Sequence, residues 1–214
     1  KTISISDGVT LVYNGKVKPE WTRNDLTNVN GTITLIMNDG SAIDVIFVEN
    51  YKNYVVDKVL EKDNKVYFKD GTERILDTSD SAIKLCLIDE KSTAVEIDSM
   101  AEWGILSVAE SEDGRIIKAV YSNRSVQGEV SECSLDGVIV KGEAYQISKT
   151  ASLSPVVGKS QIFYLDFMGK IYAMDDSLND VTYGYYTSIA QDKGLSAGVK
   201  LRIFTAKGEM KIFE

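Results

Sequence analysis

Oxygen-bearing side chains gather in one short stretch of this sequence, YAMDDSLND. Asp175, Asp176, Asn179 and Asp180 lie within six consecutive positions. Calcium is bound in proteins by carboxylate and amide oxygens, which often come from such loops. The spacing differs from that of an EF-hand loop, which ends in a glutamate. The stretch therefore predicts a solvated turn, with a structural calcium site as the alternative, and no other cofactor is expected.

Aromatic side chains form a second kind of candidate site. Trp21 follows a Pro-Glu turn, and Tyr183 and Tyr185 fall on one face of an expected strand. Exposed rings bind sugars and partner proteins, whereas the same spacing also arises from packing across strands. These three residues are the predicted ligand-binding residues. The other tryptophan, Trp103, is predicted to pack in the core at the start of a strand.

The residue types argue against catalysis. The chain has no histidine, which is the commonest general base and a common metal ligand. Neither a GxSxG motif nor a P-loop occurs, and a glycosidase would need two carboxylates facing each other across a cleft. Cys86 and Cys133 are too few for a four-thiolate zinc site, and they are either free or joined in a disulfide. We therefore predict that the protein is not an enzyme.

The charge of the chain narrows the range of partners. Lys and Arg number 24 against 32 Asp and Glu, which gives a formal net charge of −8. Nucleic acids and anionic lipids are bound by basic surfaces. No apolar run approaches the ~20 residues that a membrane-spanning helix needs. We expect neither nucleic-acid binding nor membrane insertion.

The elements that would position these residues are β-hairpins. Asp-Gly and Asn-Gly pairs recur along the chain, and such pairs supply the positive φ angles of tight hairpin turns. The flanking segments alternate apolar and polar residues, as in TITLIM and VKLRIF, which is typical of strands with one wet face. Longer helical patterns are missing from the sequence. It therefore predicts an all-β fold.

The strand pattern also repeats. The segments that begin VVDKVLEKDNKVYF and VQGEVSECSLDGVIV both follow the order strand, turn, strand, turn, strand. We predict β-modules at 53–124, with an insertion, and at 125–182, flanked by half modules at 1–52 and 183–214. Each module is expected to be a small OB-like or SH3-like barrel or a sandwich. The half modules either pair into one composite module, which would cover their open edges, or belong to a longer array.

Several hairpin phrases resemble segments of large exported proteins of clostridia and related Firmicutes, among them GTITLIMNDGSAIDVIFVEN, AEWGILSVAESEDGRIIKAVYS and VGKSQIFYLDFMGKIYAMDD. Those proteins often carry S-layer homology domains, although that anchoring motif does not occur in this sequence. The resemblance implies an extracellular, cell-surface or cell-wall location and a non-catalytic structural or spacer role. Cell-wall components or neighbouring domains of the same surface protein would be the partners. The alternatives are a carbohydrate- or protein-binding module and a phage or virion structural component.

Overall fold

The protein is all-β, as the hairpin pattern predicts. The computed structural model describes residues 4–27, 30–40, 42–77, 81–175, 184–191, 199–205 and 208–213. Within these residues the chain forms four sheets and three single 3-10 turns. Residues Lys1–Asp176 form one compact unit with three of the sheets, and Ser177–Glu214 form another with the fourth.

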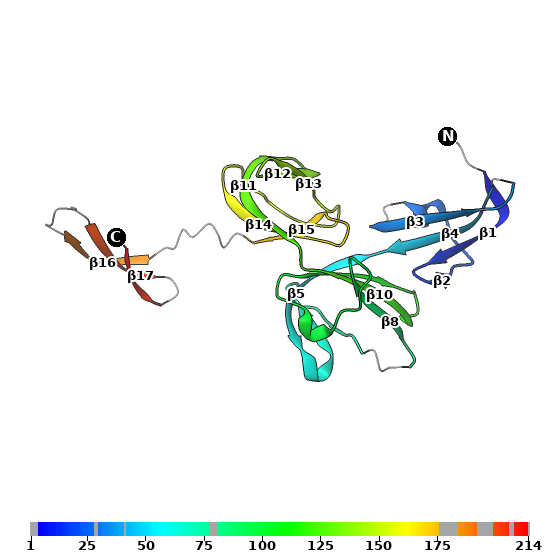
Figure 1. Cartoon of the computed structure of the whole chain (residues 1–214), viewed down its shortest axis with the longest axis horizontal. Helices are drawn as coiled ribbons and strands as arrows, with labels where there is room; N and C mark the ends of the chain where they lie inside the picture. The colour runs from blue at the N-terminus through cyan, green and yellow to red at the C-terminus, as the bar shows by residue number, and fades with distance from the viewer. Residues whose placement is uncertain are drawn as a thin grey trace. The chain divides into compact units, whose positions relative to one another are not determined.

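The first sheet has the strand order β2-β1-β4-β3. Its strands are β1 (Ile5–Tyr13), β2 (Lys16–Val17), β3 (Gly31–Met37) and β4 (Ile43–Asn50). β3 and β4 form an antiparallel hairpin, and β1 lies parallel to β4 on its other side (Figure 1). The β-branched and aromatic residues of these strands suit a pleated surface that is buried on one side. That side holds the core of the sheet, which consists of Leu11, Ile43, Ile46 and Val48.

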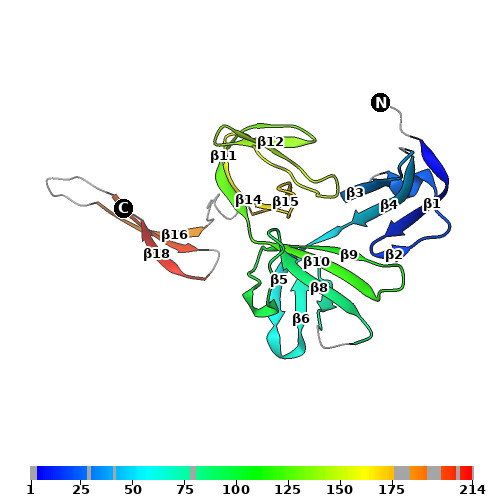
Figure 2. The same ribbon diagram turned by 45° about the vertical axis from the view of Figure 1, so that its right-hand side comes forward.

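The second sheet has the order β7-β6-β5-β9-β10-β8. Its strands are β5 (Lys52–Leu60), β6 (Lys65–Phe68), β7 (Glu73–Ile75), β8 (Lys84–Asp89), β9 (Ile105–Glu110) and β10 (Ile116–Ser122). β5 pairs with β9 through Lys52–Val55 and with β6 from Val56 onward (Figure 2). β5 therefore takes part in two layers, one with β9 and one with β6. β8 lies parallel to β10, as β1 lies parallel to β4. Residues from both layers, such as Phe68 and Leu106, share one buried core.

The third sheet repeats this arrangement in the order β13-β12-β11-β14-β15. Its strands are β11 (Ser125–Cys133), β12 (Gly137–Val140), β13 (Glu143–Gln146), β14 (Ser160–Leu165) and β15 (Ile171–Asp175). β11 pairs with β14 through Ser125–Glu129 and with β12 from Val130 onward. Phe163 is fully buried in the core of this sheet, and burying a side chain of this size stabilises the fold by roughly 2–3 kcal/mol.

The fourth sheet is an antiparallel meander of three strands in the order β16-β17-β18. Its strands are β16 (Gly184–Gln191), β17 (Val199–Thr205) and β18 (Met210–Phe213). Many of its apolar side chains are exposed, including Tyr185, Ile189 and Ile212.

The strand order distinguishes between the two expected architectures. Among the described strands no sheet closes into a barrel, so the structure agrees with the sandwich and not with the OB-like or SH3-like barrel. The third sheet comes nearest to closure, with a single bridge between Ile147 and Ile171. The pairing of 1–52 with 183–214 into a composite module stays a prediction, because these segments belong to different compact units.

Candidate functional site

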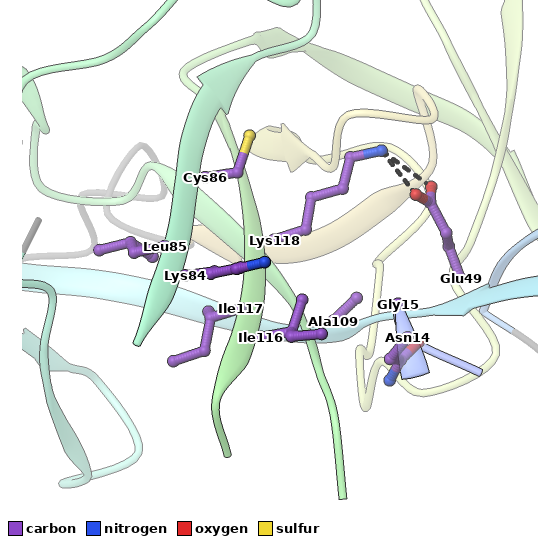
Figure 3. Close-up of a pocket in the computed structure, with 10 residues that line it drawn as sticks. All are labelled: Asn14, Gly15, Glu49, Lys84, Leu85, Cys86, Ala109, Ile116, Ile117 and Lys118. Atoms are coloured by element: carbon purple, nitrogen blue, oxygen red, sulfur yellow. Dashed lines mark hydrogen bonds and ion pairs between the residues drawn. The ribbon is translucent and has the colours of Figure 1, made fainter. Parts of the chain in front are cut away.

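A cavity of about 300 Å³ lies where the first and second sheets meet. Strand β8 contributes Lys84, Leu85 and Cys86 to its wall, and the neighbouring strand β10 contributes Ile116, Ile117 and Lys118. Asn14 and Gly15, from the turn between β1 and β2, and Glu49 of β4 line it from the first sheet (Figure 3). The lining is therefore largely apolar, with Lys84 and one charged pair, Glu49–Lys118, at its rim.

Local structure explains how these side chains converge. In the parallel pairing of β8 with β10, Cys86 lies opposite Lys118. Asn14 and Gly15 both have positive φ, 46° and 82°, as a tight two-residue hairpin turn requires. A Cβ atom on Gly15 would lie 2.9 Å from Ile116 Cγ2, so the close approach of this turn to β10 favours glycine.

The charged pair at the rim is held by several hydrogen bonds. Lys118 Nζ lies 2.7 Å and 3.0 Å from the two carboxylate oxygens of Glu49, as the dashed lines in Figure 3 mark. The Tyr51 hydroxyl donates to the same carboxylate over 2.9 Å. Burial alone would raise the pKa of Glu49, but the bonds from Lys118 and Tyr51 outweigh it and hold that pKa below its ordinary value. Glu49 therefore stays ionised at neutral pH and serves as a partner for Lys118.

A larger, charged groove of about 950 Å³ runs beside β2 and the β9–β10 turn. Two ion pairs lie within it, Lys16–Asp113 at 2.6 Å and Lys18–Asp25 at 2.6 Å. Lys16 belongs to the first sheet and Asp113 to the second, so the first pair also connects the two sheets. Because these four charged side chains are paired with one another, we interpret the groove as a contact between the sheets and not as a site for a charged ligand.

Asn14 connects the first sheet to the backbone of the second and is itself bonded to the backbone of the first. Asn14 Nδ2 donates to the Glu110 carbonyl over 2.8 Å, and Asn14 Oδ1 accepts from the Asn50 N–H over 2.8 Å. A single residue, Tyr51, separates β4 from β5. The first sheet is therefore joined to the second by a one-residue connection and by the contact of Asn14 with Glu110.

A second joint connects the second and third sheets. Asn53 Nδ2 donates to Asp166 Oδ2 over 3.2 Å, and both residues are almost fully buried. The Tyr172 hydroxyl donates to the Asn53 carbonyl over 2.9 Å. Arg124 donates to the carbonyls of Asp166 and Phe167 over 2.9 Å and 3.1 Å. The buried contact between Asn53 and Asp166 fixes one geometry, because a shift would leave these groups without partners.

Aromatic contacts complete the second joint. Trp103, just before β9, stacks on Tyr164 of β14 with ring centroids 5.1 Å apart and an interplanar angle of 10°. Tyr51 packs against Phe167 with centroids 4.7 Å apart. Such ring pairs contribute about 0.5–1.5 kcal/mol beyond the burial of their area. Trp103 was expected in the core, but it is half-buried between the two sheets.

The predicted aromatic binding residues have different surroundings. Trp21 is half-buried and packs against the core of the first sheet. Tyr185 on β16 is 83% exposed, and it lies opposite Phe204 of β17. Tyr183 lies outside the described residues. The structure thus leaves Tyr185 as the one predicted aromatic residue that it describes as freely accessible.

The predicted calcium ligands are described only in part. Asp175 ends β15 and is half-buried, whereas Asp176, Asn179 and Asp180 lie outside the described residues. Within the described part of the chain, no three acidic, cysteine or histidine side chains gather closely enough to hold a metal ion. The calcium alternative therefore stays a prediction.

The two cysteines are free and exposed, Cys86 on β8 and Cys133 on β11. Of the two alternatives that the sequence leaves open, the structure has separate thiols. They belong to the second and third sheets, on either side of the second joint.

Comparison with known proteins gives no relative. No family model, curated protein or solved structure matches the chain. In the residues that the structure describes, no helix has the length and apolar character to cross a membrane. The contacts that join the sheets are therefore the features of the described residues on which we base a function.

Proposed function

We propose that this chain is a non-catalytic structural segment of a bacterial cell-surface protein, in which sheets joined in series hold neighbouring domains at a fixed spacing. The observation that carries the proposal is the pair of joints in residues 4–175. Each joint combines a short connection between two strands with buried or paired polar contacts, and the second adds stacked rings. Sheets joined in this way resist bending at the points where a chain of modules would otherwise hinge.

Two further features support the proposal. The junctions are short, with one residue between β4 and β5 and two residues, Asn123 and Arg124, between β10 and β11. An acidic net charge of −8 keeps a segment with much exposed surface soluble. The surface location rests on the resemblance of the hairpin phrases to exported proteins of Firmicutes.

The native cysteines allow a direct test of the second joint. With spin labels on Cys86 and Cys133, pulsed electron paramagnetic resonance should give one narrow distribution of distances. The double variant Arg124→Ala/Tyr172→Phe removes three hydrogen bonds of the joint and should broaden that distribution.

The matched control is Arg115→Ala/Tyr145→Phe, which makes the same changes at exposed or half-exposed positions of the same two sheets. It should leave the distribution narrow. A broad distribution in the wild-type protein would mean that the sheets hinge freely, and the spacer proposal would then fail.

A second candidate function is binding of carbohydrate or protein, favoured by the exposure of Tyr185 and Tyr186, 83% and 57%. Co-sedimentation with Gram-positive cell walls and insoluble polysaccharides, with and without calcium, tests it. Saturable binding that Tyr185→Ala abolishes and Trp21→Ala leaves intact would favour a binding module. Absence of binding in every condition would favour the spacer.

A further inference from the structure

Strand pairing explains one wall of the cavity between the first and second sheets. In the parallel pairing of β8 with β10, Lys84 lies opposite Ile116 and Cys86 lies opposite Lys118. Residues opposite each other, and residues two apart on one strand, project from the same face of a sheet. These four side chains therefore stand on one face of the second sheet. The other face of the same strands holds the buried core.

The first sheet covers this face and leaves a small apolar space. A Cβ on Gly15 would lie 2.9 Å from Ile116 Cγ2, so the turn between β1 and β2 comes into close contact with β10. The volume of about 300 Å³ is at the lower end of the ~300–1,000 Å³ that small-molecule sites have. A fitting ligand is therefore small and largely apolar. The apolar lining consists of Leu85, Ala109, Ile116 and Ile117.

The charges of the lining do not balance. Among its described residues, Lys84 and Lys118 stand against one carboxylate, that of Glu49. Lys118 donates to both oxygens of this carboxylate over 2.7 Å and 3.0 Å, so these two charges neutralise each other (Figure 3). The Lys84 ammonium group makes no hydrogen bond or ion pair with the part of the chain that the structure describes. The cavity thus keeps one uncompensated positive charge, in a chain whose net charge is −8.

We propose that this cavity binds a small aliphatic carboxylate, with its apolar chain between the two sheets and its carboxylate group on the Lys84 ammonium. A single negative charge matches the one cation that lacks a partner. A phosphate dianion would bring a second negative charge beside Glu49, which already has its partner, and a cationic ligand would be repelled by Lys84. The inference is independent of the spacer role, which rests on other contacts.

Octanoate serves as the probe, and the two native cysteines report on its binding. Cys86 lines the cavity, whereas Cys133 lies in the third sheet, and both thiols are exposed. Octanoate below its micelle concentration should slow the alkylation of Cys86 by uncharged iodoacetamide, with half of the effect at a concentration on the order of 1 mM. The rate at Cys133 should stay unchanged. Mass spectrometry of the two cysteine peptides gives both rates from one sample.

Substitution of Lys84 tests the role of the charge. Lys84→Met keeps the alkyl stem and removes the ammonium group, so it should weaken octanoate binding by at least about threefold. Lys91→Met is the matched control, because it removes the charge of another exposed lysine, just beyond β8 and outside the cavity. This control should bind octanoate like the wild type. Each variant is compared with itself across octanoate concentrations, so that a change in the intrinsic reactivity of Cys86 does not enter the result.

The ligand is varied in the same way. 1-Octanol has the same chain as octanoate and no charge, so it should protect Cys86 of the wild type less than octanoate does. In Lys84→Met this difference between the two ligands should shrink, since the partner of the carboxylate group is gone. The β-sheet circular dichroism of each variant shows whether its fold is retained.

Four results would overturn the proposal. Alkylation of Cys86 that octanoate does not slow in the wild type would exclude this ligand from the cavity. Equal slowing at Cys133 would show that the alkyl chain binds without a specific site. Equal protection by 1-octanol would show that the cavity accepts apolar molecules whatever their charge. Unchanged octanoate binding in a folded Lys84→Met would exclude Lys84 as the partner of the carboxylate group.

Discussion

Tyr51 contacts groups from three sheets at once. It separates β4 from β5, its ring packs against Phe167 of the third sheet, and it shares a buried cluster with Ala109 and Val120 of the second. Its hydroxyl donates to Glu49, and burial together with this bond raises the pKa of Tyr51 above its ordinary value. A tyrosine at this point was not among the predicted site residues, because its role depends on partners distant in the sequence.

Asp113 offers a prediction at the residue scale. Hydrogen bonds from Lys16, the largest contributor, and from Ser111 and the Arg115 backbone lower the pKa of Asp113 from its ordinary 3.8 to about 2. A carboxyl whose pKa is depressed in the folded state stabilises the protein above its unfolded pKa. That contribution should be lost as the pH falls from about 4 to about 2.

The measurement is a carboxyl-carbon NMR titration of the wild type and of Lys16→Met. The variant should raise the pKa of Asp113 toward 3.8. Lys18→Met is the control in the same groove, and it should raise the pKa of Asp25 instead, whose largest cause of depression is the bond from Lys18. An unchanged Asp113 in Lys16→Met would assign the depressed pKa to the Ser111 hydroxyl, the next contributor.

Hairpins are the elements that local sequence specifies best. Asn14-Gly15 and Asp113-Gly114 form tight turns with positive φ at their glycines, as expected from the pairs themselves. Parallel pairing of β8 with β10 and of β1 with β4 was not predicted. Parallel neighbours are distant in the sequence, and no turn residue marks their register.

The backbone geometry of Trp103, just before β9, leads to a prediction about stability. Its φ of 69° is in the left-handed region, which costs a residue with a Cβ about 1–2 kcal/mol. Stacking on Tyr164 and the approach of Lys69 Nζ to 4.1 Å from the ring centre offset that cost. Once the ring is removed, glycine should be tolerated better than alanine. Trp103→Gly should be more stable than Trp103→Ala by about 1 kcal/mol in urea unfolding.

Trp21 provides the control for this comparison. It is not among the residues with positive φ, so Trp21→Ala should be at least as stable as Trp21→Gly. If alanine is the better residue at position 103 as well, the positive φ carries no measurable cost there and the prediction fails.

At the scale of the whole molecule, the all-β class followed from the sequence but the joints did not. Asn53 and Asp166 are 113 positions apart, and each is an ordinary polar residue in its local context. The sequence left barrel and sandwich open, because short alternating strands suit open and closed sheets alike. What the sequence lacks is information about which edges stay open.

The division of the chain into two compact units leads to a third prediction. Deletion of 177–214 should leave the Tm of the remaining unit unchanged to within about 3 °C in dilute solution, since 1 kcal/mol corresponds to ~2–4 °C in a chain of this size. Deletion of 171–214 also removes β15, with the buried residues Ile171 and Ala173, and should lower the Tm markedly. Differential scanning calorimetry of both truncated proteins checks this, and a large loss in the shorter deletion would contradict it.

The strands on either side of each junction also determine how the first unit would respond to tension. β4, β5, β10 and β11 are all interior strands of their sheets. Near the junctions β5 pairs with β9 and β11 pairs with β14. A pulling force that passes along the backbone from one sheet to the next therefore enters through strands in the interior of each sheet. Their hydrogen bonds would be loaded together in shear and not peeled one at a time from an edge. The first unit should accordingly extend in a few abrupt steps, one for each sheet that gives way.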